Sequence, residues 1–103
     1  MSGQQFNTVF ERTKDSLLGL WHSLPGRFSG TKKRTDYIIT TERARLSLVG
    51  QLEDLKEFSP NNRHLIKALD LMHSLNTFPS IGRFRKYIPK ILVLIQKVKD
   101  HEN

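Results

Sequence analysis

Apolar residues recur at intervals of three and four along four stretches of the chain, and this spacing predicts amphipathic helices. The first predicted helix runs roughly from Phe6 to Leu24. Thr8 and Glu11 have the spacing of a capping box, which predicts that the helix opens there. The apolar face of this helix is formed by Phe6, Val9, Phe10, Leu17, Leu20, Trp21 and Leu24.

The second predicted helix follows Thr41, which has the character of an N-cap, and ends near Phe58. Its residues recur at three and four, as one buried helix face requires. That face contains Ala44, Leu48, Leu52 and Leu55, with Val49 and Phe58 beside it.

The third predicted helix follows Ser59 and Pro60, which fit an N-cap and a first helical position because proline needs no amide partner there. Pro79 disfavours helical dihedral angles at Phe78, so we expect the helix to end before that residue. Its apolar face contains Leu65, Ile66, Leu69, Met72 and Leu75.

The fourth stretch, SIGRFRKYIPKILVLIQKV, places basic and aromatic residues directly before an apolar run. Ser80 is suited to cap a short turn that extends to Tyr87, with Pro89 near the first position of the main helix. A strand over Ile91 to Ile95 is the alternative, because periodicity does not separate the two for so short a run. A helix is favoured, because the polar residues that follow continue the helical spacing and no second strand is available for pairing.

Between the first two helices, the stretch PGRFSGTKKRT predicts an irregular basic linker, because Pro25, Gly26 and Gly30 interrupt regular structure. We therefore expect an all-α fold, a small bundle of about four helices forming a single domain over residues 1–103. Residues 1–30 would hold the N-terminal amphipathic helix and the start of the linker, and residues 41–100 the helical core.

The charge of the chain restricts its partners. Seventeen lysines and arginines oppose ten carboxylates, giving a net charge of +7 and a pI near 10.1. This balance favours acidic partners, namely nucleic acid, anionic lipid headgroups or acidic protein segments. The longest apolar run, Ile91 to Ile95, is far below the roughly 20 residues of a membrane-spanning helix. The N-terminus lacks the pattern of a secretory signal, so we expect an intracellular protein.

Residues suited to catalysis are sparse. The chain has no cysteine, and Glu53 and Asp54 are adjacent on a predicted helix, so their side chains diverge by about 100°. The stretch SGTKKRT lacks the spacing of a phosphate-binding loop, although its KKR triplet has the composition of half a nuclear localisation signal. We expect no metal, no cofactor and no enzymatic activity. The four histidines also lack the spacing of a zinc site: His22, His64, His73 and His101.

One candidate binding site is the cluster that opens the fourth stretch. It interleaves four cations with two aromatic rings, a combination that neutralises phosphates or acidic side chains while the rings stack or anchor. The alternative is a helix start whose rings point inward and whose cations point to water. The cluster consists of Arg83, Phe84, Arg85, Lys86, Tyr87 and Lys90.

A second candidate is the apolar face of the first helix, represented by Phe6, Phe10, Leu17 and Trp21. This face suits the core of the protein itself, a groove of a partner or a lipid interface. For the lipid alternative, the cations of the linker supply contacts to anionic headgroups. These candidate anion contacts are Lys32, Lys33 and Arg34.

The segment LIKALDLMHSLNTFPSIGRFRKY resembles the TFIIS-type N-terminal domain, whose relatives include the integrase-binding domain of chromatin-tethering coactivators. The resemblance covers residues 41–100 and implies a nuclear scaffold without catalytic activity that docks short acidic and aromatic segments of transcription and chromatin partners. It rests on the IGR and RKY motifs and on Ile66, Ala68, Leu69, Asp70, Ser74 and Leu75.

Three functions therefore remain open. The leading hypothesis is a non-enzymatic helical interaction module, a scaffold or complex subunit, that docks acidic and aromatic segments of partner proteins. The first alternative is a peripheral membrane-surface protein that uses the N-terminal helix and the basic linker. The second is a weak and non-specific nucleic-acid binder that uses the basic cluster. The nucleus is the favoured compartment, with the cytoplasm or an organelle as alternatives.

Overall fold

The computed structural model describes residues 3–102 and shows only helices there. They are α1 (Gly3–His22), α2 (Thr31–Thr40), α3 (Glu42–Phe58), α4 (Arg63–Thr77) and α5 (Ile81–Glu102). The predicted all-α bundle is confirmed. The number of helices is five rather than four, because α2 lies within the segment predicted to be an irregular linker.

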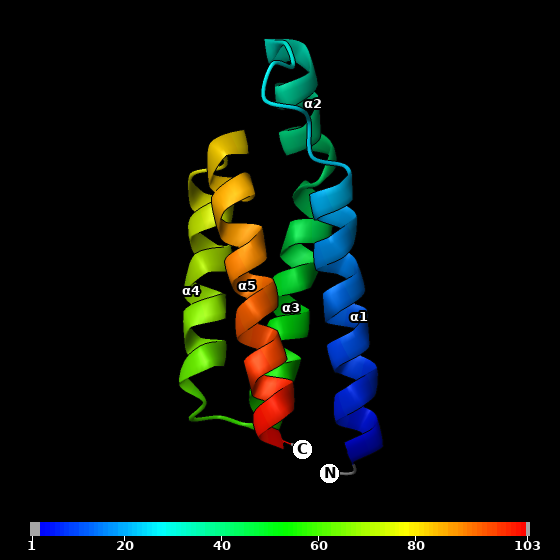
Figure 1. Cartoon of the computed structure of the whole chain (residues 1–103), viewed down its shortest axis with the longest axis vertical. Helices are drawn as coiled ribbons and strands as arrows, with labels where there is room; N and C mark the ends of the chain where they lie inside the picture. The colour runs from blue at the N-terminus through cyan, green and yellow to red at the C-terminus, as the bar shows by residue number, and fades with distance from the viewer. Residues whose placement is uncertain (1–2, 103) are drawn as a thin grey trace.

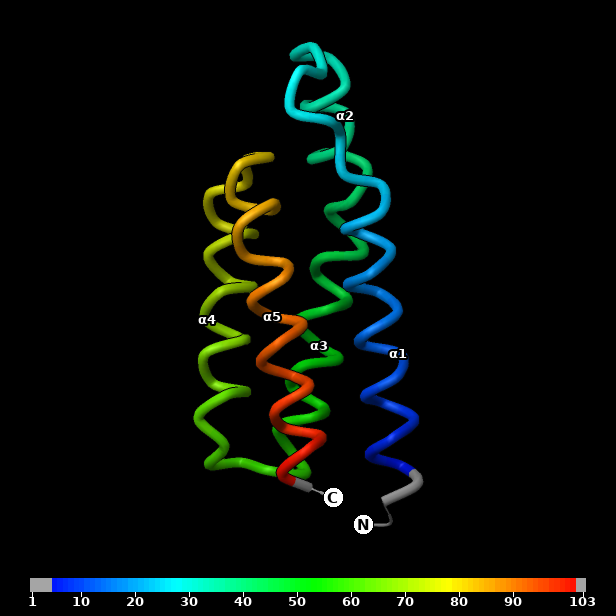
Figure 2. Tube along the Cα trace, in the orientation of Figure 1, coloured from blue at the N-terminus to red at the C-terminus, as the bar shows by residue number. Residues whose placement is uncertain are grey.

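The four long helices run alternately up and down along the bundle (Figure 1). α1 packs against α3 and α5, and α4 packs against the same two helices, so each long helix has two antiparallel neighbours. The result is a rod of 45 × 21 × 19 Å. α2 lies at one end of the rod, beyond the ends of α1 and α3, while the two ends of the described chain lie near each other at the opposite end (Figure 2).

One buried apolar cluster takes residues from all five helices. Leu48, Leu52 and Leu55 of α3 are fully buried, as their spacing predicts. The buried residues of α4 and α5 follow the same rule: Leu65, Leu69, Met72 and Leu75, then Ile88, Ile91, Ile95 and Val98. The helical periodicity therefore identified most of the core.

Helix α1 belongs to this core. Phe6, Phe10 and Leu17 are buried, and Trp21 is partly buried against the same cluster. The apolar face that suited a lipid or a partner is therefore covered by α3 and α5. The predicted capping box does not open the helix, because α1 begins at Gly3 and Thr8 lies inside it.

Helix α2 has little apolar surface, and Tyr37 is the buried residue that anchors it to the bundle, with Ile38 partly buried beside it. The Tyr37 hydroxyl donates a 2.8 Å hydrogen bond to the carbonyl oxygen of Leu20 in α1. Its ring meets the Phe84 ring of α5 edge to face, with 5.3 Å between the centroids. α2 is thus held across the bundle by a residue whose neighbours in the sequence are mostly polar.

Helix α3 differs from its predicted face at one position. Ala44, predicted to be buried, is exposed, and Arg45 is buried in its place with only 3% exposure. Thr41 precedes the helix, but its side chain makes no capping bond, and its hydroxyl instead donates to the Tyr37 carbonyl oxygen at 2.7 Å. The buried guanidinium was not foreseen, because its partners lie on other elements.

Helix α4 begins three residues later than predicted. Asn62, rather than Ser59, is the N-cap, and its Oδ1 accepts hydrogen bonds from the backbone amides of His64 (2.9 Å) and Leu65 (3.4 Å). Ile66 was predicted to be buried and is instead exposed. The predicted end of the helix before Phe78 is confirmed.

Helix α5 is continuous from Ile81 to Glu102, with Pro89 inside it rather than at its start. Ser80 caps it, since its Oγ accepts a 3.2 Å hydrogen bond from the Arg83 amide. Because proline has no N–H, the Arg85 carbonyl loses its usual partner within the helix. The strand alternative for Ile91 to Ile95 is excluded.

Candidate interaction surface at the basic end

The two rings of the predicted binding cluster face the interior. Phe84 is fully buried, between the ring of Tyr37 and the guanidinium of Arg45. Tyr87 is partly buried against the core. The prediction that Phe84 contacts a partner is therefore wrong, because a continuous α5 turns this position toward the other helices.

The two arginines of the cluster are half-buried and engaged within the protein. Arg83 donates to Ser74 Oγ at 3.3 Å and lies over the Phe78 ring, 5.4 Å from its centroid. Arg85 donates a 2.9 Å hydrogen bond to the Pro25 carbonyl, which ties the loop after α1 to α5. Lys86 and Lys90 are exposed, so only the two lysines of the cluster remain available to a partner.

The predicted anion contacts Lys32, Lys33 and Arg34 lie in the first turns of α2 rather than in a linker. Lys32 and Lys33 are exposed. Arg34 is half-buried, and its guanidinium donates to the Arg27 carbonyl. The structure therefore places two of these three cations in solvent, at the same end of the bundle as Lys86.

The buried Arg45 joins three helices at this end. Its guanidinium donates to the Ile38 carbonyl of α2 (2.6 Å) and to Asn76 Oδ1 of α4 (2.9 Å), and its Nε donates to Thr41 Oγ1 (3.2 Å). Burial lowers the pKa of Arg45, an effect opposed by the nearby charges of Glu42 and Tyr37. The sequence did contain a signal for the burial of Arg45, because this residue lies three positions before Leu48 and therefore on the apolar face of the helix.

Positive charge is concentrated at the end of the bundle that carries α2, which we call the basic end and define as residues 22–46 and 73–90 (Figure 1). The basic end contains ten lysines and arginines and only two carboxylates, Asp36 and Glu42. The rest of the chain contains seven basic and eight acidic residues. The net charge of the protein therefore comes from one half of the rod.

Six cations of the basic end are exposed, and their side chains have no hydrogen-bond or ion-pair partner within residues 3–102. They are Arg27, Lys32, Lys33, Arg43, Lys86 and Lys90. Three other arginines form side-chain hydrogen bonds within the protein and hold the surrounding helices and loop in place: Arg45, Arg83 and Arg85. The basic end therefore presents unpaired positive charges on helices that these hydrogen bonds hold together.

Exposed apolar side chains lie at the same end. Phe28 is 100% exposed in the loop between α1 and α2, and Ile39 and Phe78 are each 63% exposed. A hollow of about 240 Å³ between α2, α3 and the end of α4 is lined in part by Ile39, Leu46 and Pro79. Cations and apolar anchors are therefore available together to a partner.

Within residues 3–102, no group of three histidines or carboxylates is arranged to hold a metal ion. Glu53 and Asp54 are both exposed on α3. None of the helices in the described part of the chain combines the length and the apolar character needed to span a bilayer.

No protein-family model, no curated protein and no solved structure matches this chain. The resemblance to TFIIS-type domains therefore stays a prediction. Two of the residues that carry it, Ala68 and Leu75, are fully buried in the bundle. Core packing is enough to account for them.

Proposed function

We propose that this protein is a non-enzymatic interaction module whose basic end binds an acidic segment of a partner protein. The observation that carries the proposal is the segregation of charge, ten cations against two carboxylates at one end of the rod. Charge arranged in this way accelerates encounter with acidic partners and disfavours basic ones. Like charges gathered at one end of the rod repel one another and so destabilise the folded protein. A cluster that carries this cost favours a binding role.

The chemistry of the basic end defines the segment that it would bind. Unpaired lysines on α2 and α5, such as Lys33 and Lys86, complement aspartate, glutamate or phosphorylated side chains. Phe28 and Phe78 offer apolar contacts beside these charges. The expected partner segment therefore combines acidic residues with aromatic or aliphatic ones, which supply the buried anchors of an interface.

A transcription or chromatin role and a nuclear location are part of this proposal only through the resemblance to TFIIS-type domains. The other part, recognition of an acidic segment, rests on the exposed cations themselves. The two are separable, because the identity of a captured partner tests the first and the position of the binding residues tests the second.

The experiment compares two charge-reversed variants in affinity purification from cells. Lys32→Glu/Lys33→Glu changes the basic end, whereas Arg12→Glu/Arg63→Glu makes the same change in net charge on exposed residues of the opposite half. Both variants should fold, because exposed substitutions usually change stability by about 0.5 kcal/mol or less. We expect the first variant to lose its acidic partners and the second to retain them. Equal retention, or equal loss, would exclude a docking role for the basic end.

The same variants distinguish two other ligands of the basic end, a membrane surface and a nucleic acid. Phe28, fully exposed beside Arg27, has the chemistry of a side chain that enters a lipid interface. If the wild type sediments with vesicles containing phosphatidylserine and Lys32→Glu/Lys33→Glu does not, the partner is a membrane surface. Binding to DNA or RNA should fall steeply with rising salt. Sequence-selective binding at physiological salt would replace the protein-partner proposal.

A further inference from the structure

A separate surface lies on the flank of the rod, along the outer face of α5. Between α4 and α5 runs a groove of about 340 Å³, lined by Leu71, Pro89, Val93 and Leu94 with a lysine from each helix, Lys67 and Lys90. Leu71 and Leu94 are partly buried against the core. Val93 stands on the outside, with 55% of its surface exposed. The floor of the groove is therefore apolar carbon.

A second hollow lies on the other side of Val93, between α1 and α5. It has about 270 Å³ of space and is lined by Leu18, Leu92, Val93 and Lys14, together with parts of Phe10, Ile95 and Gln96. Val93 lines both hollows and separates them. The outer face of α5 thus presents an apolar ridge with a depression on each side, a shape that suits side chains from a packed helix.

The charged residues that line the two hollows all have one sign. No carboxylate within residues 3–102 lines either hollow, whereas Lys14, Lys67 and Lys90 do. Lys86, Lys90, Val93 and Lys97 follow one another at intervals of four, three and four, so they form one exposed stripe along α5. Asp100, near the end of this stripe, accepts a hydrogen bond from Gln96. Lysines therefore flank the apolar strip on both sides, while Asp100 and the Glu11–Lys99 pair lie toward its C-terminal end.

We propose that the flank formed by α4, α5 and α1 is a docking site for an amphipathic helix of a partner protein, with aliphatic residues on the face that it buries and carboxylates along both edges. The aliphatic face covers Val93 and fills the groove beside Leu71 and Leu94. The carboxylates pair with Lys67 and Lys90 on one side and Lys14 on the other. The stripe from Lys86 to Lys97 is about 16 Å long, enough for three turns of a docked helix.

Charge complementarity selects this occupant over a second copy of the chain. In a two-fold dimer the same face meets itself, so the lysine stripe of one copy would oppose the lysine stripe of the other. Like charges placed against each other across an interface are destabilising. An acidic amphipathic helix has no such conflict, and helix-in-groove docking is a common mode of peptide recognition.

Pro89 gives independent support. It lies inside α5, where proline removes one backbone hydrogen bond and crowds the preceding turn, and it lines the groove. Departures from local helix preference occur most often at functional sites. The inference goes beyond the proposed function, because it concerns the flank and not the end of the bundle; the two surfaces overlap only where they adjoin on α5, at Lys86, Pro89 and Lys90.

The test uses a designed peptide of about 18 residues with leucines at i, i+3, i+4 and i+7 and glutamates along both edges, a pattern that forms one apolar helix face. Binding is measured by fluorescence anisotropy, and the site is mapped by amide chemical shifts of the labelled protein. We expect shift changes to centre on Leu71, Val93 and Leu94. A matched peptide with lysine in place of glutamate should bind at least about tenfold more weakly, because it repels the stripe.

Two protein variants locate the site. Val93→Glu introduces a carboxylate on the ridge and should weaken the acidic peptide at least about tenfold. Ile66→Glu makes the same chemical change at another exposed aliphatic side chain (43%), on the face of α4 away from the groove, and should leave the affinity unchanged. Thermal melts confirm that both variants fold; should Val93→Glu not fold, Lys67→Glu/Lys97→Glu replaces it.

Three results would overturn the inference. They are no binding of the peptide, shift changes centred on α2, and equal weakening of the peptide by Val93→Glu and Ile66→Glu. Binding of vesicles containing phosphatidylserine that Val93→Glu abolishes would also overturn it, because the ligand would then be a lipid surface. Failure of the flank leaves the basic end testable, since Lys32→Glu/Lys33→Glu alters no residue of the groove.

Discussion

The guanidinium of Arg45 lies over the ring of Phe84, 5.4 Å from its centroid, and both side chains are buried. The stacking leaves the edge of the guanidinium free to donate to the Ile38 carbonyl and to Asn76 Oδ1. A single side chain thereby connects α2, α3, α4 and α5 at the basic end. The positions of the exposed cations depend on this joint.

We predict that Arg45→Met lowers the free energy of unfolding by about 2 to 4 kcal/mol, because it leaves the partly buried oxygen atoms of Ile38 and Asn76 without a donor. Arg43→Met is the control, since Arg43 is exposed on the same helix and should cost no more than about 0.5 kcal/mol. Urea denaturation measures both. Amide hydrogen exchange in residues 31–40 should also rise in the Arg45 variant alone. Similar effects of the two substitutions would contradict the role of Arg45 as a joint.

We predict that Tyr37→Phe destabilises the protein by about 1 to 3 kcal/mol at neutral pH, because the Leu20 carbonyl loses its buried donor. The size of this effect should depend on pH. Burial raises the pKa of Tyr37 from 10.0 to about 12, an effect that the charge of Arg45 partly offsets. The unfolded chain therefore loses this proton at lower pH than the folded protein does.

The stabilisation due to Tyr37 is thus complete below about pH 10 and is lost as the pH rises to about 12. The difference in stability between the wild type and Tyr37→Phe should shrink over that interval. Tyr87→Phe is the matched control for tyrosine ionisation elsewhere. The tyrosinate absorbance that Tyr37→Phe removes should appear near pH 12; its appearance near pH 10 would show that Tyr37 is not buried in solution.

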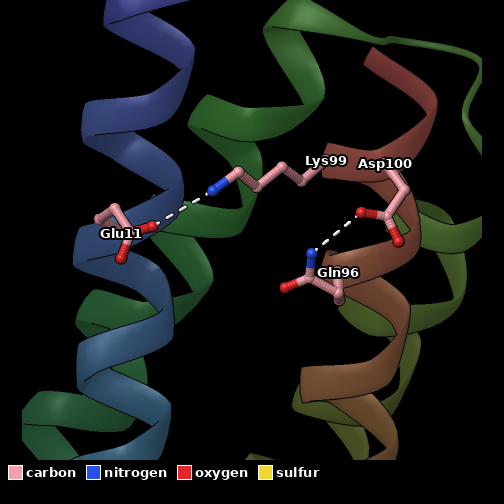
Figure 3. A network of polar contacts seen from close by, with 4 residues as sticks. All are labelled: Glu11, Gln96, Lys99 and Asp100. Carbon is pink, nitrogen blue, oxygen red and sulfur yellow. Dashed lines mark hydrogen bonds and ion pairs between the residues drawn. The ribbon is translucent and has the colours of Figure 1, made fainter. Parts of the chain in front are cut away.

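The cross-helix pair between Lys99 and Glu11 should contribute little. Lys99 Nζ lies 3.4 Å from Glu11 Oε1 on α1, and the two side chains are 28% and 52% exposed (Figure 3). A double-mutant cycle with Glu11→Gln and Lys99→Met should give a coupling of about 0.2 to 1 kcal/mol that decreases with salt. Asp100→Asn, which alters the bond with Gln96 inside α5, serves as the control (Figure 3).

Lys99 should nevertheless contribute more to the stability of the protein than Glu11 does. Lys99 also lies over the Phe10 ring, with Nζ 4.8 Å from the centroid. Lys99→Met should therefore cost more than Glu11→Gln, because it removes a cation–π contact as well as the ion pair. Equal costs in high salt would show that the ring contact is not formed in solution.

The attachment of α1 can be tested with two adjacent leucines. Leu17 is fully buried and Leu18 only partly, so Leu17→Ala should cost about 2 to 5 kcal/mol and Leu18→Ala distinctly less. Thermal melts followed by circular dichroism measure the difference. A Leu17→Ala variant that keeps its stability and instead loses vesicle binding would mean that α1 faces lipid rather than the core.

The amino-acid sequence by itself determined the long helices. Leucines such as Leu48, Leu52 and Leu55 recur along enough turns to define one apolar face, and burying that face is the dominant favourable term in folding. Pro25 and Pro79 interrupt the pattern at places where the structure also has breaks. Local spacing was sufficient there, because a regular helix repeats the same geometry at every turn.

The tertiary structure alone decided what happens at the basic end. α2 is too short and too polar to be predicted from the spacing of apolar residues. It is anchored by the contacts of Tyr37 with Leu20 and Phe84, residues far away in the sequence. Arg45 is buried only because oxygen atoms from α2 and α4 surround it. The path of α5 through Pro89 and the helices packed against α5 decide which residues of the cluster at positions 83–90 face the solvent. Local periodicity carries no information about such partners, since they come together only when the helices pack.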